Sequence, residues 1–174
     1  MPSVKTDRLL GLSLCLLVGG LVYAIYAGIH ERVVVEGDTA PEFAVTADNG
    51  RLVSMPHFEG RLLVLNFWAS WCPPCVEETP SLSRLAQRDA DKGLVVLGVS
   101  VDRNEASYRA FLRKYQPAFL TARERKLHAE FGTFMYPETY IVASDGKVLK
   151  KIAEGVDWMD PNTIRYIDSL LGNP

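Results

Sequence analysis

The chain has 174 residues, a net charge of −2, 48% hydrophobic residues and three cysteines. This length allows one domain with an appendage, and the near-neutral charge excludes the basic surface typical of a nucleic-acid-binding protein. Only one cysteine pair lies outside the apolar N-terminal segment, which excludes a disulfide-stapled miniature fold.

An uncharged apolar run, residues 9–29, comes first along the chain. At about 1.5 Å per residue, such a run is long enough to cross a hydrocarbon core of about 30 Å. Because Lys5 and Arg8 precede it, the positive-inside rule predicts a transmembrane anchor with residues 1–8 in the cytoplasm and the remainder exported. A cleaved signal peptide is the alternative, but the run is long for one and no A-x-A-like cleavage site follows.

Cys15 lies inside this apolar run, directly after Leu14. A leucine is too large for the position before a lipidated cysteine. We therefore expect Cys15 to behave as a small buried hydrophobic residue.

Strand and helix signals alternate after a linker expected at residues 30–40, so the folded domain is predicted to span 41–174. Residues 42–47 and 51–54 predict a hairpin around the turn Asp48-Asn49-Gly50. Two continuous apolar runs, 61–68 and 94–101, are typical of buried strands. Between them, the spacing of apolar residues predicts a helix from Pro73 to about Ala90.

The second half of the domain contains two predicted helices, at 105–115 and 124–131, followed by a hairpin and a last helix. The hairpin joins strands at 138–143 and 147–153, and Asp160 with Pro161 opens the last helix. This order predicts an α/β fold whose central sheet is mixed, with helices on both faces.

The sequence FWASWCPPC at 67–75 places two cysteines, two residues apart, between a buried strand and a helix. Proline is well tolerated in the first turn of a helix, so Pro73 and Pro74 place Cys72 at the helix N-terminus. The positive end of the helix stabilises a thiolate there. Cys75, one turn inside, is close enough to resolve a mixed disulfide on Cys72, and the pair is therefore predicted to be redox-active.

Other roles for the cysteine pair are less well supported. A zinc site needs four ligands, and His30, His57 and His128 are scattered. A structural bridge would close a very short loop and stabilise little. A peroxidase would use a lone reactive cysteine with a nearby threonine, which is absent here. Cu(I) accepts few soft ligands and remains an alternative, although no His or Met flanks CPPC.

The motif LNFWASWCPPC at 65–75, with APEF at 40–43, EETP at 77–80 and YPETY at 136–140, resembles the thioredoxin superfamily. Among its members, the chain is most similar to the membrane-anchored, exported branch that includes TlpA, ResA and the cytochrome c maturation reductase. The resemblance covers roughly residues 37–172 and implies a thioredoxin-like fold.

The resemblance also implies roles for individual residues. Cys72 matches the nucleophile, Cys75 the resolving cysteine and Pro137 the family's cis-proline, and the two cysteines are expected to form a reversible disulfide. Asn66 replaces the buried aspartate of thioredoxin, so Glu78, on the same helix face as Cys75, is expected to exchange a proton with it. The residues expected to contact substrate are Trp71, Pro73, Pro74, Tyr136, Pro137 and Glu138.

The predicted function is a membrane-anchored thiol–disulfide oxidoreductase that reduces exported proteins on the periplasmic or extracytoplasmic side. The resemblance implies apocytochrome c as substrate and a membrane electron donor of the DsbD or CcdA type. No cofactor, metal or nucleic acid is expected. The alternatives are a disulfide-forming oxidase and a non-enzymatic copper-binding assembly module.

Overall fold

The computed structural model describes residues 4–29, 33–55 and 57–172, and the chain divides into two compact units between Arg32 and Val33. The first unit contains one helix, α1 (Val4–Ile29). Where side chains are described, no helix combines the length and the apolar character needed to cross a membrane. Residues 30–32 of the predicted linker, and the side chains of Lys5 and Arg8, lie outside the described residues.

The expectation for Cys15 was wrong. Its side chain is exposed in α1 rather than buried. A lone helix has no packing partner within its own unit, so the apolar character of the residue does not lead to burial there.

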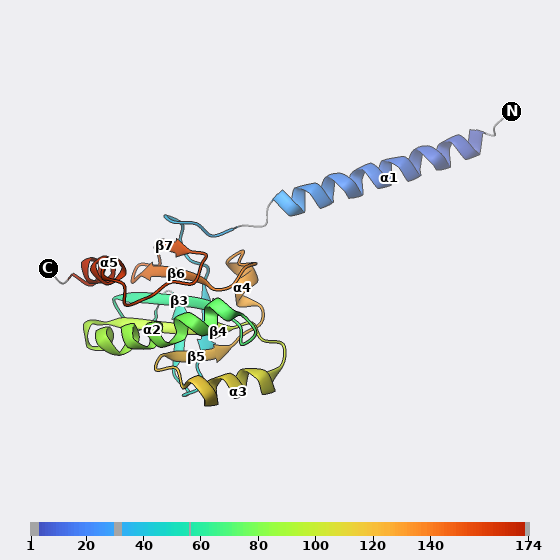
Figure 1. Ribbon diagram of the computed structural model, residues 1–174. Helices are drawn as coiled ribbons and strands as arrows, with labels where there is room; N and C mark the ends of the chain where they lie inside the picture. Colours follow the sequence, from blue (N-terminus) through green and yellow to red (C-terminus); the bar gives the residue numbers. More distant parts are fainter. Residues whose placement is uncertain (1–3, 30–32, 56, 173–174) are drawn as a thin grey trace. The chain divides into compact units, whose positions relative to one another are not determined.

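The second unit alternates strands and helices along the chain, as Figure 1 shows. In order, its elements are β1 (Phe43–Thr46), β2 (Leu52–Met55), β3 (Leu62–Trp68), α2 (Pro73–Asp89), β4 (Leu94–Ser100), α3 (Glu105–Tyr115), β5 (Leu120–Arg123), α4 (Leu127–Glu130), β6 (Glu138–Ala143), β7 (Val148–Ile152) and α5 (Pro161–Leu171). A short 3-10 turn, Ala90–Lys92, extends α2 until Gly93 ends it in the left-handed conformation.

Five strands form the central sheet in the order β5-β4-β3-β6-β7 (Figure 1). The central strand β3 runs parallel to β4 and antiparallel to β6, which confirms the predicted mixed sheet. All seven residues of β3 are buried, as expected for a continuous apolar run at the centre of a sheet. The hairpin β1–β2 forms a separate two-stranded sheet.

Apolar cores lie on both faces of the central sheet. Helices α2 and α5 pack on one face through Leu82, Leu85, Ile167 and Leu171, against Val64 and Val96 of the strands. The hairpin and α4 cover the other face, where Val45, Val53 and Leu127 pack with Leu63, Leu65 and Leu97. Alternation along β3 therefore divides its side chains between the two cores.

The region between β4 and β6 differs from the prediction. Residues 124–131 were expected to be helical, but α4 is a single turn, Leu127–Glu130. Just before it lies β5, an edge strand parallel to β4 that the sequence did not indicate. A four-residue strand with two half-buried ends carries too little apolar alternation to be recognised, because its pairing depends on β4 rather than on its own pattern.

The folded unit also begins earlier than residue 41. Val34 is buried, its N–H donates to Phe131 O at 3.1 Å, and Lys151 Nζ donates to Val34 O at 3.2 Å. Thr39 forms an antiparallel bridge with Lys147, just before β7. Most of the segment expected to be a linker is therefore part of the domain.

Candidate active site

Cys72 is the N-cap residue of α2, in an extended conformation with φ −95° and ψ 107°. Pro73 and Pro74 follow in the first turn, where their missing N–H groups leave no intrahelical bond unmade. The Cys75 N–H points back and donates to Cys72 Sγ at 3.3 Å. The sulfur thus takes the place of a capping oxygen, and the helix N-terminus favours negative charge on it after reduction.

Cys72 and Cys75 form a disulfide, with their Cα atoms 5.3 Å apart. Both cysteines are buried, with exposed fractions of 4% and 1%. The Tyr136–Pro137 peptide bond is cis, the isomer that the resemblance implied, and Tyr136 O lies 3.3 Å from Cys72 Sγ. A disulfide sulfur carries no hydrogen, so this contact becomes a hydrogen bond only when Cys72 is a thiol.

The surface around Cys72 is an exposed apolar hollow of about 410 Å³, which we call the cysteine hollow. Its lining residues are Trp71, Cys72, Pro73, Pro74, Phe134, Met135 and Tyr136. Trp71, Phe134 and Met135 are 66%, 64% and 67% exposed, which is unusual for large apolar side chains gathered in one place. This arrangement suits an apolar partner segment that lies beside the disulfide.

Sequence reasoning missed Phe134 and Met135. The sequence does place two large apolar residues side by side in the loop before Tyr136. Such residues are usually buried in a core, so their position in a loop could have indicated an exposed binding surface. Met135 also places a thioether in the same hollow as Cys72, although no methionine is near CPPC in the sequence.

The two tryptophans that flank the motif have different environments. Trp68 is buried, and its ring lies 4.4 Å from that of Phe111, centroid to centroid. Trp71 is exposed and stands edge-on to Tyr136 at 6.0 Å. Trp68 is therefore part of the core, whereas Trp71 belongs to the surface at the cysteines.

Glu78 lies three residues after Cys75 on α2 and is only 4% exposed. Asn66 Nδ2 donates to its Oε1 at 2.8 Å, while the Val156 N–H and the Trp158 indole N–H donate to Oε2. Burial raises the pKa of the Glu78 carboxyl to about 7, and the hydrogen bonds from Asn66, Val156 and Trp158 oppose that rise in pKa. A carboxyl with this pKa can take up or release a proton near neutral pH.

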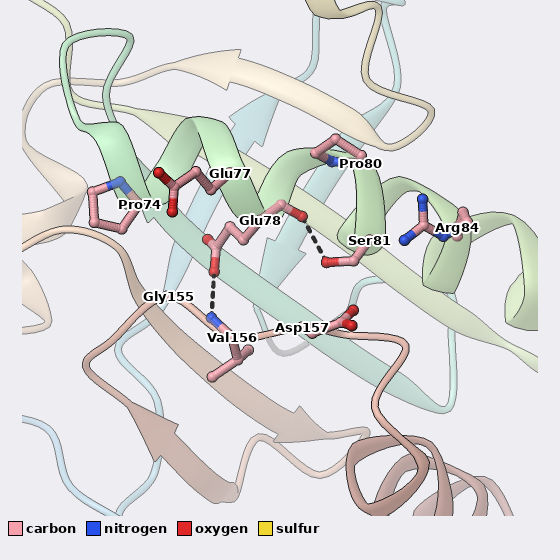
Figure 2. A pocket seen from close by; sticks show the side chains of 9 residues that line it. All are labelled: Pro74, Glu77, Glu78, Pro80, Ser81, Arg84, Gly155, Val156 and Asp157. Atoms are coloured by element: carbon pink, nitrogen blue, oxygen red, sulfur yellow. Dashed lines mark hydrogen bonds between the residues drawn. The ribbon is translucent and has the colours of Figure 1, made fainter.

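A second cleft, of about 400 Å³, opens beside Glu78 and is called the glutamate cleft here. Figure 2 shows Glu78 reaching from α2 toward Val156, with Gly155 and Asp157 on the opposite wall. Pro74 lines this cleft as well as the cysteine hollow. Glu78 is thus next to a route to solvent even though its side chain is almost fully covered.

Glu138 does not belong to the exposed surface, contrary to its expected role in substrate contact. Its side chain is buried, Lys151 Nζ lies 2.6 Å from Oε1, and the Tyr140 hydroxyl donates to the same oxygen. Thr139, the next residue along β6, contacts Asn66, which also contacts Glu78. Since successive residues of a strand point to opposite faces of the sheet, Glu138 lies on the opposite face from Glu78.

Asp102 fixes the loop that carries Trp71 and Cys72. Its buried carboxylate accepts hydrogen bonds from the Ser70 N–H and hydroxyl, both at 2.9 Å, and from the Ser100 hydroxyl at 2.7 Å. The end of β4 thereby holds the turn that follows β3. Sequence reasoning did not single out this residue, since its partner Ser70 lies 32 positions away.

The described residues contain no group of three or more His, Cys, Asp and Glu side chains placed to hold a metal ion. The site itself contains the Cys72–Cys75 pair. That pair lies next to an ionisable carboxyl and an exposed apolar surface.

Comparison with known proteins agrees with this chemistry. The model of the AhpC/TSA family matches residues 36–151. The thiol-disulfide oxidoreductase ResA of Bacillus thuringiensis is 30% identical over 156 residues, which cover 86% of this chain and 90% of the relative. The thioredoxin-like protein YneN of Bacillus subtilis is 34% identical over 146 residues, which cover 80% and 85%.

A solved structure extends the similarity to the fold. The crystal structure of a Chlorobium tepidum protein assigned as the thiol:disulfide interchange protein DsbE superposes with a TM-score of 0.72 and 26% identity, covering 81% of this chain and all of the other. These matches confirm the predicted resemblance, and the chain belongs to the AhpC/TSA family as a thiol–disulfide oxidoreductase with a Cys72–Cys75 pair.

Proposed function

We propose that this oxidoreductase works as a reductase of disulfides in exported proteins, with Cys72 as nucleophile and Cys75 as resolving cysteine. The observation that carries the proposal is the position of Cys72. Its sulfur caps α2, accepts the Cys75 N–H and lines an exposed apolar hollow. A thiolate is favoured at that position and a partner disulfide can approach it.

The reaction begins when the Cys72 thiolate attacks one sulfur of the substrate disulfide. The other substrate sulfur leaves as a thiolate, and a mixed disulfide forms. The Cys75 thiolate then attacks Cys72 Sγ, so the substrate leaves fully reduced and the Cys72–Cys75 disulfide carries the oxidation. Glu78 takes the proton of the Cys75 thiol in this second step, because its pKa of about 7 suits transfer near neutral pH.

We further propose that residues 9–29 anchor the protein in the cytoplasmic membrane and that the catalytic domain lies outside the cytoplasm. Support comes from the uncharged apolar run and the preceding Lys5 and Arg8. An exported site needs an electron source, which we assign to a membrane donor of the DsbD or CcdA type. Apocytochrome c, with its paired haem-attachment cysteines, is the proposed substrate on the basis of the branch resemblance.

The reduction potential of the cysteine pair tests the direction of electron flow. The full-length protein is titrated against thiol redox buffers while tryptophan fluorescence is followed. A potential near or below about −230 mV is expected, in the range of known reductants. A potential near about −120 mV would identify a disulfide-forming oxidase instead.

Cys72→Ala tests the assignment of the nucleophile. Full-length Cys72→Ala is expected to lose all disulfide reductase turnover, because Cys72 lines the cysteine hollow and Cys75 does not. Cys15→Ala is the matched control and should retain full activity. Turnover that survives in Cys72→Ala would disprove the proposed steps.

Cell fractionation tests the anchor. The full-length chain is expected to stay with the membrane after washes with high salt and alkaline carbonate, and to be degraded by protease added outside the cytoplasmic membrane. Recovery in the soluble fraction would remove the anchor from the proposal.

Copper binding is a second candidate activity, favoured by Met135, whose thioether lines the same hollow as Cys72. Cu(I) prefers such soft sulfur ligands. Titration of the reduced full-length protein with Cu(I) tests it, and Met135→Leu should weaken any binding that is found. Absence of binding at stoichiometric metal would exclude it.

A further inference from the structure

A third hollow, of about 430 Å³, lies next to the cysteine hollow and is called the basic hollow here. Its lining residues are Trp71, Val101, Asp102, Arg103, Asn104, Ser107, Arg125, His128 and Tyr136. Trp71 and Tyr136 line both hollows and stand edge to face at 6.0 Å. The aromatic pair therefore separates an apolar surface at Cys72 from a second binding surface.

The charge of this second hollow is positive at its exposed positions. Arg103 and Arg125 are exposed, and neither forms an ion pair with another described residue. The nearby Glu105 is already paired with Arg109 and Arg123.

The other titratable groups of the basic hollow do not cancel this charge at the surface. Asp102 is buried, and its carboxylate is occupied by Ser70 and Ser100. The His128 Nδ1 contacts Thr133 O at 3.0 Å and the Tyr136 hydroxyl at 3.2 Å. The groups available to a ligand are therefore the two arginines, which suit carboxylates.

We propose that the substrate of this reductase is an extended segment with an apolar side chain beside its reactive cysteine and carboxylates beyond the Trp71–Tyr136 pair. An extended chain advances about 3.3 Å per residue, so residues roughly two to four positions from the cysteine reach the basic hollow. The apolar side chain packs on Phe134 and Met135, and Arg103 and Arg125 bind the carboxylates. This inference rests on the proposed reductase function and specifies, in addition, that the substrate segment is negatively charged.

The test compares two disulfide-containing peptides of one sequence, with an apolar residue beside the cysteine and either two aspartates or two lysines three positions away. Pre-reduced full-length protein is mixed with each peptide, and the single-turnover rate is followed by tryptophan fluorescence. The wild type is expected to reduce the acidic peptide about three- to tenfold faster, as for exposed charge pairs. This preference should shrink at high salt.

The double variant Arg103→Glu/Arg125→Glu is expected to reverse the preference. The matched control is Arg113→Glu/Arg165→Glu, which changes the net charge equally at exposed arginines outside the basic hollow and should keep the wild-type ratio. Because the two peptides are compared within each variant, a general loss of activity does not alter the ratio.

A neutral small disulfide separates this inference from the proposed function. If wild type reduces that compound but reduces both peptides equally, or neither, the substrate inference is overturned and the reductase survives. If wild type reduces none of the three compounds, the proposed function itself fails. A ratio reversed equally by both double variants would assign the preference to overall charge and would also overturn the inference.

Discussion

Glu78 shows how burial and hydrogen bonding can set one carboxyl to a pKa near neutrality. Burial alone favours the neutral acid, whereas three N–H donors favour the carboxylate, and the pKa settles at about 7. Asn66 is central to this balance, since its amide bonds both Glu78 and Thr139. The residue that replaces the buried aspartate of thioredoxin is thus a hydrogen-bond partner of Glu78, the proposed base.

The kinetic consequence concerns the resolving step. In the wild type, resolution of the mixed disulfide by Cys75 should accelerate as the pH rises through about 7, because Glu78 loses its proton and becomes a base. Glu78→Gln should slow this step on the order of 100-fold and remove the inflection near pH 7 from the plot of its rate against pH. Stopped-flow measurement of the rate of resolution between about pH 5.5 and 8.5, a range on both sides of the Glu78 pKa, checks this.

The matched control for that experiment is Glu77→Gln, because Glu77 is the exposed neighbouring carboxyl. It should keep the wild-type profile. If both variants keep the inflection near pH 7, Glu78 does not exchange the proton.

The same raised pKa affects stability. Since the folded protein holds the Glu78 proton up to about pH 7 and the unfolded chain releases it near 4.5, the free energy of unfolding should fall as the pH rises across this window and level off above it. The contribution is on the order of 3 kcal/mol at most. Urea denaturation of the oxidised protein at several pH values measures it, and Glu78→Gln should show a smaller fall. Identical slopes would contradict the assignment.

At the scale of elements, the active site depends on the loop between β3 and α2 being held by the end of β4. Asp102 provides that connection through three hydrogen bonds to Ser70 and Ser100. Buried carboxylates with several donors contribute more than neutral groups do, and their loss leaves the donors unpaired.

Asp102→Ala should therefore lower the free energy of unfolding by about 1–3 kcal/mol. Asp102→Asn should cost less, because its amide can donate to the Ser70 hydroxyl, which is also an acceptor. Urea denaturation of the oxidised protein compares the two variants with Asp91→Asn, an exposed control that should be neutral. An Asn variant as unstable as the Ala variant would show that charge, rather than hydrogen bonding, is what matters.

The local parts of the fold were predictable from sequence. The two prolines after Cys72 determine where α2 begins, and Asp160 with Pro161 does the same for α5, because caps act through neighbouring residues. The edge strand β5 was not predictable, because it is held in a strand conformation by pairing with β4 rather than by a pattern in its own residues. The cysteine pair was found from its place at the start of one helix and Glu78 from the family resemblance, whereas the exposed Phe134 and Met135 became recognisable only beside Cys72 in space.

At the scale of the whole molecule, the folded unit extends upstream of the hairpin. The segment before Pro41 adds backbone hydrogen bonds to the edge of the domain, including Gly37 N–H to Val148 O at 2.8 Å and Val148 N–H to Asp38 O at 2.8 Å. Val34 and Ala40 are buried in the same core as the hairpin. The segment therefore contributes to stability as an added strand would.

A chain that starts at Val33 should be more stable than one that starts at Pro41. Several backbone hydrogen bonds and the buried Val34 and Ala40 separate them, so the expected difference exceeds about 3 kcal/mol. Thermal and urea unfolding of the two purified domains measures the difference. Equal stability would mean that residues 33–40 contact the domain without contributing to its free energy of unfolding.

The separation of the cysteine hollow from the glutamate cleft has a consequence for the order of events during turnover. The two openings share Pro74 but are otherwise lined by different residues. The proposed partner contacts Trp71 and Met135 in the cysteine hollow, whereas Glu78 lines the glutamate cleft, which Figure 2 shows. If Glu78 takes the proton of Cys75 as proposed, that proton can leave through the glutamate cleft while the partner still occupies the cysteine hollow, and proton release need not wait for product to dissociate.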